Sequence, residues 1–193
     1  DAGSLVAKSA LEIGAQVDII TSNKDEIFSD FNYGIINWRQ ILQNKHWLLI
    51  SSTTVLEGNS PSSAWSASMI FGELEGTKTV MIVDLPKDYA KVPEMWGQII
   101  NRIRQIHILF FTKEALDSIS KLENTTNHLL LKKIKSKGIV PIVCTYDENE
   151  SISYIIHPSG ELSLKLQSKY PFHLWLPDHP FFCKILCRLL TNW

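Results

Sequence analysis

The sequence predicts an α/β protein with a mostly parallel sheet. Short apolar runs that are typical of buried strands alternate along the chain with longer stretches whose apolar residues recur at helical spacing. The 193 residues, 45% of them hydrophobic and 20% charged, are sufficient for a globular domain with a substantial core. Because alternating strands and helices form βαβ units, we expect a single domain over residues 1–193 whose sheet is covered on both faces.

The first elements are expected close to the N-terminus. Apolar residues at helical spacing predict a helix over residues 2–14, and Gly14 is a suitable C-cap because glycine adopts positive φ freely. Residues 17–20 and 47–50 are short apolar runs, and each predicts a buried strand. The chain is therefore expected to begin with one helix and two strands.

The alternation continues through the rest of the chain. Pro61, followed by two serines, opens a helix that is expected to end at Gly72 or Gly76. Pro158 and Gly160 separate two short apolar runs, which predicts a β-hairpin. The further expected elements are strands over 79–83, 106–111 and 139–145, helices over 92–104, 113–122 and 126–137, the hairpin strands over 153–156 and 162–166, and a closing helix over 181–190.

Composition and charge exclude several classes of function. With 19 Lys and Arg against 20 Asp and Glu, the chain lacks the basic field that attracts nucleic acid, so no direct nucleic-acid binding is expected. The longest apolar runs are too short to cross a bilayer, so no membrane partner is expected. Three cysteines make no disulfide framework, which favours an intracellular reducing compartment. Cys183 and Cys187 are interpreted as core residues, and no metal site is expected.

The candidate site is expected at the carboxyl ends of the strands, where open parallel sheets bind their ligands. Residues 176–182 precede the closing helix, at the place where a phosphate-binding turn would be expected, yet they contain no glycine. A backbone that wraps an anion needs glycine, and here Pro177 and Pro180 each remove a donor. This segment suggests a kinase-like architecture whose chemistry has been lost.

Five segments, taken in chain order, carry a resemblance to a known family. They are Ile13-Gly14-Ala15, Asp25-Glu26-Ile27-Phe28, Val83-Asp84-Leu85-Pro86, Phe111-Thr112-Lys113-Glu114 and residues 137–145. They resemble, respectively, the end of the N-terminal helix motif, Gly-Asp-Asp-x-Phe-Gly, Phe-Asp-x-Asn, Asn-x-x-Glu and the Lys-Gly to Thr-x-Gly strand of the ribokinase, or PfkB, carbohydrate kinases. Within that family the chain is most similar to 2-keto-3-deoxygluconate kinases and fructokinases.

The resemblance implies a ribokinase-like three-layer α/β/α sandwich. It also implies that an active member would use ATP and magnesium. The family's substrate lid has little room between Phe28 and Trp38, so the lid is expected to be reduced or missing. The resemblance places Asp178 or His179 at the catalytic base, Thr145, Glu114 and Asp147 at the nucleotide and its magnesium, and Asp25 and Asp84 at the substrate.

Departures from the family motifs determine the functional expectation. Leu5 stands where the family has a sugar-binding Asn, and Phe111 replaces the Asn of Asn-x-x-Glu. Pro86 replaces the Asn after Asp84. Asp147 replaces a glycine that approaches nucleotide phosphate, and a carboxylate there would repel it. Because positioning and electrostatics supply most of the catalysis in phosphoryl transfer, these losses predict a catalytically degenerate protein.

We therefore expect a structural or interaction subunit of a larger assembly, with protein partners and no cofactor. Family analogy makes an organellar gene-expression complex, in a plastid or mitochondrion, one candidate setting. Two alternatives stay open, namely an active ATP-dependent sugar or 2-keto sugar-acid kinase and a sensor that binds sugar or nucleotide without turnover. A simpler interpretation also stays open, because charged residues at strand ends are commonly solvated or cap the next helix.

Overall fold

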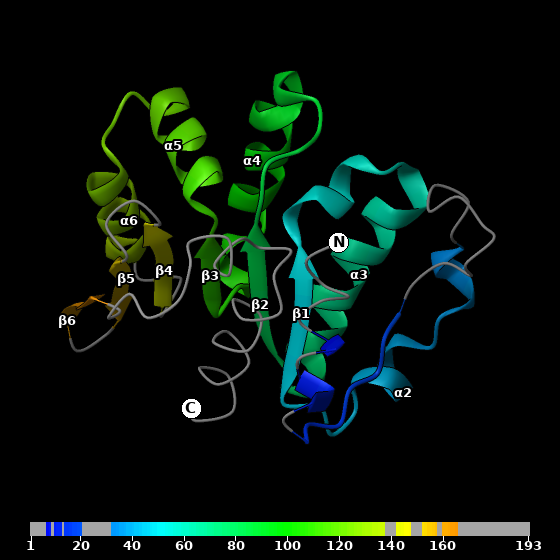
Figure 1. Ribbon diagram of the computed structural model, residues 1–193. Coiled ribbons are helices and arrows are strands. Elements are labelled where there is room, and N and C mark those ends of the chain that lie inside the picture. The colour runs from blue at the N-terminus through cyan, green and yellow to red at the C-terminus, as the bar shows by residue number, and fades with distance from the viewer. Residues whose placement is uncertain are drawn as a thin grey trace.

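The computed structural model describes residues 7–8, 10–12, 14–20, 32–137, 142–147, 152–157 and 160–165 (Figure 1). Six strands in these ranges form one sheet, and their order across the sheet is their order in the sequence. The first four are parallel, and the last two add an antiparallel hairpin. The strands are β1 (Trp47–Ser51), β2 (Lys78–Val83), β3 (Ile108–Phe111), β4 (Ile142–Asp147), β5 (Ile152–His157) and β6 (Gly160–Lys165). The predicted α/β class, mostly parallel sheet and hairpin are confirmed.

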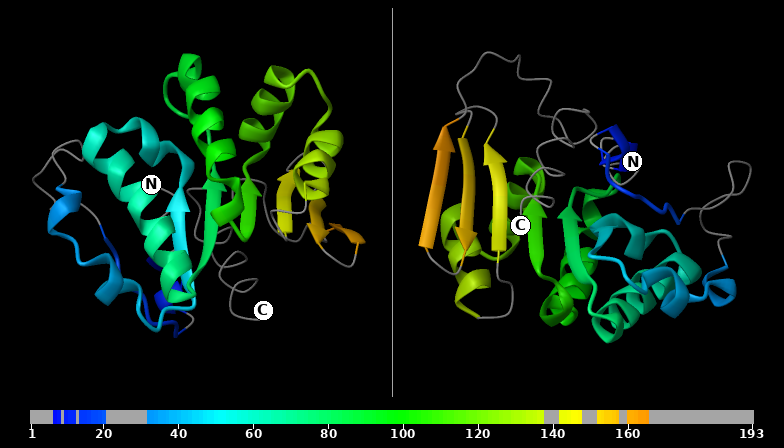
Figure 2. Two further views of the ribbon diagram at one scale, coloured as in Figure 1. Left: turned by 180° about the vertical axis from the view of Figure 1, so that it is seen from behind. Right: turned by 90° about the horizontal axis from the view of Figure 1, so that it is seen from below.

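Helices connect the parallel strands and lie on one face of the sheet (Figures 1 and 2). This placement follows from topology, because right-handed crossovers that always advance to the next strand put every connecting helix on the same side. The helices are the short α2 (Trp38–Leu42) before β1, α3 (Asn59–Glu75), α4 (Val92–Asn101), α5 (Lys113–Leu122) and α6 (Asn127–Ser136). No helix in the described ranges is long and apolar enough to span a membrane.

From Thr79 onward β2 is buried on both faces, and so is β3. Met81 and Val83 belong to the core cluster that the helices share, and their side chains are fully inaccessible. Val80 and Ile82 alternate with them along β2, so they point to the opposite face, and they are equally inaccessible. Burial on both faces explains why β2 is a continuous apolar run and not an alternating one. It also agrees with the expected three-layer arrangement.

Local chemistry accounts for where the helices begin and end. Thr112 caps α5 by accepting a 3.3 Å hydrogen bond from the backbone N–H of Ala115, and Thr126 caps α6 in the same way. The helix predicted to end at Gly72 or Gly76 ends at Gly76, which has φ +75°. The helix predicted over 92–104 ends at Asn101 and continues as a 3-10 turn over Ile103–Gln105.

Of three further predicted elements, one strand is wrong, one strand is shorter than predicted, and one helix is confirmed. The strand predicted over 17–20 is wrong, because residues 15–20 join no sheet and Ile19 is 55% exposed. The strand predicted over 106–111 begins only at Ile108, because the N–H of Ile106 closes the preceding turn on Ile103. The helix ending at Gly14 is confirmed for its described residues, where Gly14 has φ +86° and its N–H bonds the carbonyl of Leu11.

Two expectations fall on residues outside the described ranges. The closing helix over 181–190 lies wholly outside them. The reduced lid was expected between Phe28 and Trp38, and residues 21–31 are likewise not described. Within that interval the structure describes a 3-10 turn over Tyr33–Ile35, which begins at the N-cap Asn32.

Candidate functional site

The candidate site is the edge of the sheet formed by the carboxyl ends of β1 to β4. The strand register aligns Val83 with Phe111 and Phe111 with Thr145, so β2 and β3 end at one level and β4 continues to Asp147. Asp84 and Thr112 each follow the last residue of a strand. Parallel strands thus bring together polar residues that are far apart in the sequence. This is the edge at which open α/β sheets hold ligands.

Asp84 is the centre of a hydrogen-bond network along this edge. Its backbone N–H donates to the hydroxyl of Ser52 over 3.1 Å, and that hydroxyl donates to the Asp84 carbonyl over 3.4 Å. The Asp84 carboxylate accepts from the backbone N–H of Leu85 at 2.8 Å and from the hydroxyl of Thr112 at 3.3 Å. The half-buried Asp84 therefore links the ends of β1, β2 and β3.

Thr145 contributes its hydroxyl to the pairing of β3 and β4. The side chain is 3% exposed, and its Oγ1 donates a 3.1 Å hydrogen bond to the backbone carbonyl of Phe111. A buried hydroxyl needs such a partner, because leaving it without one costs about 1–3 kcal/mol. The structure thus places Thr145 at the predicted edge, with its donor directed at the protein's own backbone.

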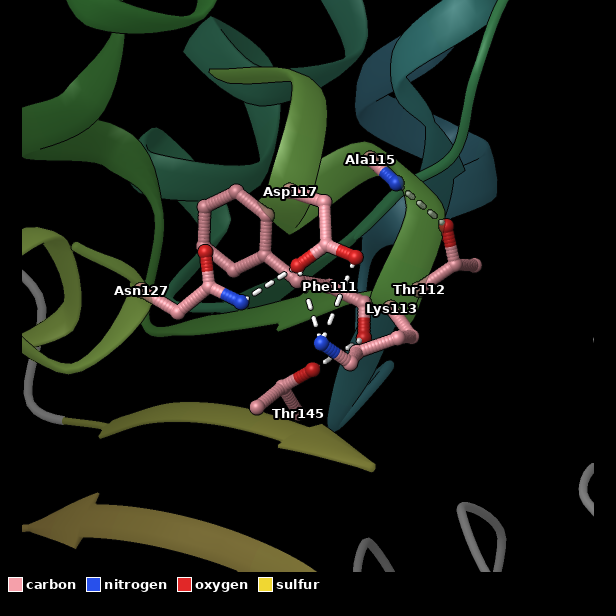
Figure 3. A network of polar contacts seen from close by, with 7 residues as sticks. All are labelled: Phe111, Thr112, Lys113, Ala115, Asp117, Asn127 and Thr145. Carbon is pink, nitrogen blue, oxygen red and sulfur yellow. Dashed lines mark hydrogen bonds and ion pairs between the residues drawn. The ribbon is translucent and has the colours of Figure 1, made fainter. Parts of the chain in front are cut away.

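A second polar network surrounds the first turn of α5 (Figure 3). Lys113 lies 2.9 and 3.2 Å from the two carboxylate oxygens of Asp117, one helical turn further along α5. Asn127, the first residue of α6, donates to the same carboxylate (Figure 3). The Asp117 carboxylate thereby connects the starts of two helices. Glu114, the residue predicted to lie near magnesium, is exposed in the first turn of α5.

Phe111 occupies the position of the Asn in the family's Asn-x-x-Glu motif and lies in the core. It is fully inaccessible, and its ring packs against Trp96 with 6.0 Å between centroids and 54° between planes. The Trp96 indole N–H in turn donates a 2.9 Å hydrogen bond to Glu123. This hydrogen bond, followed by that from Lys133, lowers the pKa of the Glu123 carboxyl. The motif position is thus part of a helix-packing unit.

The structure brings together some of the predicted site residues and leaves others undescribed. Asp84 directly follows β2, Thr145 lies near the end of β4, and Glu114 lies in the first turn of α5, which follows β3. The backbone of Asp147 ends β4 and pairs with Ile152, and its side chain is outside the described set. Asp25, Asp178 and His179 lie outside the described residues, and their roles stay predictions.

Sequence reasoning missed the partners that complete both networks. Ser52, Lys113, Asp117 and Asn127 were not singled out, although two signals were present. Lys113 and Asp117 are four apart on a helix, which is the spacing of an ion pair. Thr112, directly before a helix, has the pattern of an N-cap. The contacts from Ser52 and Asn127 depend on tertiary neighbours, for which the sequence has no local signal.

The described residues do not by themselves form a magnesium site. No group of three or more His, Cys, Asp or Glu side chains among them could hold a metal ion. Asp84 already accepts two hydrogen bonds through Oδ1. Glu114 is exposed and belongs to no such group among the described residues. The described part of the edge therefore contains no metal site built from protein side chains alone, and we derive no catalytic step through a bound metal.

Comparison with known proteins identifies the fold. No family model matches the sequence, and no curated protein matches it. Among solved structures, a putative ribokinase II from E. coli in complex with ATP and Mg²⁺ matches with a TM-score of 0.69 and 11% identity, covering 91% of this chain. A PfkB protein from Polaromonas sp. JS666 matches with a TM-score of 0.68 and 14% identity, covering 86% of this chain. A fructokinase with bound ATP from Xylella fastidiosa matches with a TM-score of 0.66 and 10% identity, covering 99% of this chain.

These matches show a ribokinase/PfkB-like fold, as the motif order predicted. The chain spans only 55%, 53% and 65% of the lengths of those three structures, in the same order. At such low identity the likeness establishes the fold and does not transfer activity, because one fold supports many functions.

Proposed function

We propose that this chain is a catalytically degenerate, PfkB-type sugar-kinase-like protein that serves as a structural or interaction subunit of a larger assembly. The observation that supports this most directly is the use of the polar groups at the candidate edge. Ser52 and Thr112 each bond Asp84, and Thr145 bonds the carbonyl of Phe111. These groups hold strand ends together.

This arrangement is unfavourable for phosphoryl transfer for a physical reason. That reaction depends on donors and metal ions that are positioned in advance around the transferred group. At this edge the Lys113 ammonium already has the Asp117 carboxylate at 2.9 Å, so its charge is balanced within the protein. Redirecting such a group toward a ligand would break existing contacts, and each broken contact would weaken ligand binding.

The sequence supports the same proposal at positions outside the edge network. Residues 176–182 contain two prolines and no glycine where the resemblance expects an anion-binding turn. Phe111 stands at the motif position of an Asn and is committed to packing on Trp96. Independent substitutions at several motif positions, beside a parallel sheet whose strands β2 and β3 are buried, are expected of a protein selected for its fold and surface. No cofactor is required for that role.

Calorimetry of the purified protein with Mg-ATP and with a non-hydrolysable analogue tests the loss of nucleotide binding. We expect no saturable heat, whereas the Xylella fastidiosa fructokinase, whose structure contains ATP, serves as the positive control. Micromolar binding, about −8 kcal/mol, would contradict the proposal. So would magnesium-dependent phosphorylation of fructose or 2-keto-3-deoxygluconate that disappears in Asp178→Asn or His179→Gln variants.

Affinity purification of the tagged chain at its natural expression level tests the subunit role. We expect the same protein partners in stoichiometric amounts in independent preparations, and elution from a sizing column well above the mass of the free protein. Elution as a free monomer without partners would overturn the subunit role, even if nucleotide binding were absent.

A further inference from the structure

A hollow of about 340 Å³ lies away from the strand-end edge, between α3, the end of α4 and the turn at Tyr33–Ile35. The backbone N–H of Tyr33 donates to the Ser60 hydroxyl over 3.0 Å, which holds this turn against the start of α3. The lining of the hollow includes Tyr33, Trp65, Ile70, Gln98 and Arg102, together with serines of α3. None of the residues of the candidate edge contributes to it.

The polar lining is rich in donors and contains no acid. Arg102 supplies the positive charge and is half-buried. Its guanidinium donates to the Ser66 hydroxyl and to Gln105 Oε1, and it forms no ion pair with any described carboxylate. An arginine that is partly withdrawn from water and lacks an acidic partner favours an anion with several acceptor oxygens.

Trp65 lies beside the hollow and can report on its occupancy. It is 3% exposed and lines the hollow, and its indole N–H has no hydrogen-bond partner among the described residues. Buried polar groups almost always have a partner, so an isolated buried N–H requires an explanation. The indole nitrogen is itself inaccessible, so a ligand in the hollow would contact the ring and not this N–H, whose signal reports on the hollow from a neighbouring position.

The size and apolar part of the lining indicate more than an inorganic ion. At about 30 Å³ per water molecule, the hollow has room for roughly eleven waters, which exceeds what one phosphate group fills. Ile70 and Tyr33 are 38% and 41% exposed and present apolar surface beside the charged end. An organic group attached to the anion could cover this surface.

We propose that this hollow binds a small organic phosphate monoester. The phosphate contacts the Arg102 guanidinium and the neighbouring donors, and the organic group packs on Ile70 and Tyr33. This inference does not depend on the state of the strand-end edge, so it stands or fails separately from the loss of nucleotide binding.

Separate titrations with phenyl phosphate, inorganic phosphate and phenol test the proposal. Binding is measured by calorimetry and by the tryptophan indole N–H signals in ¹⁵N–¹H spectra. The Trp65 signal is identified by its absence in Trp65→Phe. We expect phenyl phosphate to saturate the site, to shift the Trp65 signal and to bind about tenfold more tightly than either fragment. Absence of saturation into the millimolar range, or equal affinity for inorganic phosphate, would overturn the proposal.

Matched variants test the role of Arg102. Arg102→Gln should weaken phenyl phosphate binding by about tenfold or more, because it removes the charge. Arg104→Gln removes the same charge from an exposed residue outside the hollow and should leave binding unchanged. Equal loss in both variants would indicate a diffuse charge effect and contradict the proposal. If Arg102→Gln does not fold, Gln98→Ala, at an exposed lining position, should still weaken binding.

Discussion

Glu123 connects three helices through its carboxylate. It ends α5, accepts from the Trp96 indole of α4 at 2.9 Å, and pairs with Lys133 of α6 at 3.2 Å. The hydrogen bond from Trp96 is the main cause of the lowered pKa of Glu123. A carboxyl whose pKa is lower in the folded state stabilises the fold above its unfolded value of 4.5. That contribution is lost as the pH falls through the folded pKa.

Glu123→Gln should therefore reduce the free energy of unfolding by about 1 kcal/mol near neutral pH, because the amide is a weaker acceptor. Urea unfolding at about pH 7 and about pH 3 should show this difference shrinking at the lower pH. Glu57→Gln, at an exposed position, is the matched control and should have no effect at either pH. A difference that is constant with pH would contradict the role of the ionised carboxylate.

His107, which directly precedes β3, also has a shifted pKa. Its Nδ1 accepts a 3.1 Å hydrogen bond from the backbone N–H of Thr79, so the neutral ring is favoured. Burial lowers the pKa of His107 below its usual 6.5, and nearby Lys78 adds to this, while Glu73 opposes it. The unfolded chain takes up a proton first, so the stabilisation present above pH 6.5 is lost as the pH falls below it.

We expect His107→Gln to flatten the pH dependence of stability in this interval. Urea unfolding at about pH 7 and about pH 5 should show the wild type losing more stability than the variant. His46→Gln, at an exposed position, should behave as the wild type does. If wild type and His107→Gln lose equal stability, protonation of this ring does not contribute.

At the scale of elements, two glycines in helices differ in backbone conformation. Gly76 ends α3 with φ +75°, its N–H bonding the carbonyls of Gly72 and Glu73. Gly97 lies inside α4 with ordinary φ. A Cβ added at either position would meet nothing within 4 Å, so the two sites differ in backbone conformation and not in space.

Gly76→Ala should cost about 1–2 kcal/mol, because an L-residue is strained in the left-handed region. Gly97→Ala should stabilise the protein by about 0.5–1 kcal/mol, because alanine loses less backbone entropy in a helix. Urea denaturation of the two variants, under identical conditions, measures both changes. The same sign in both variants would show that conformation is not the deciding factor.

At the scale of the whole molecule, one cluster of buried side chains extends from Trp38 to Ile156. It contains residues of α2 to α6 and of β1 to β5. Phe111 is fully inaccessible within it. A core that is shared by so many elements predicts one cooperative unfolding transition for the described part of the chain.

Phe111→Asn, which restores the family motif, should lower the free energy of unfolding by at least about 4 kcal/mol. It removes a packed ring and buries an amide. Phe111→Leu should cost only about 1.5 kcal/mol and serves as the control that folds. Circular dichroism and tryptophan fluorescence should report the same midpoint for each variant. A well-folded, equally stable Phe111→Asn protein would contradict the assignment of this residue to the core.

Sequence patterns predicted most of the fold and only the location of the candidate site. The run at 79–83 is clear because both faces of that strand are buried, and the run at 47–50 is clear because it is apolar throughout and pairs with β2. The run at 17–20 looks the same, but a strand also needs a neighbour to pair with, and no local pattern reports that neighbour. The strand ends were predicted as the edge of interest. The hydrogen bond between Asp84 and Ser52, which are 32 residues apart, could not be predicted, because that contact depends on sheet register.

The sequential strand order has a consequence for how the chain is synthesised. From β2 to β6, each strand pairs with the strand that precedes it in the sequence. When a strand leaves the ribosome, the strand with which it pairs has therefore already been synthesised. Chains emerge at about 5–20 residues per second, and neighbouring segments close their loops in far less time. The described sheet can therefore grow strand by strand during translation. At each step one unpaired strand edge is open, and a nascent-chain chaperone would have to protect it.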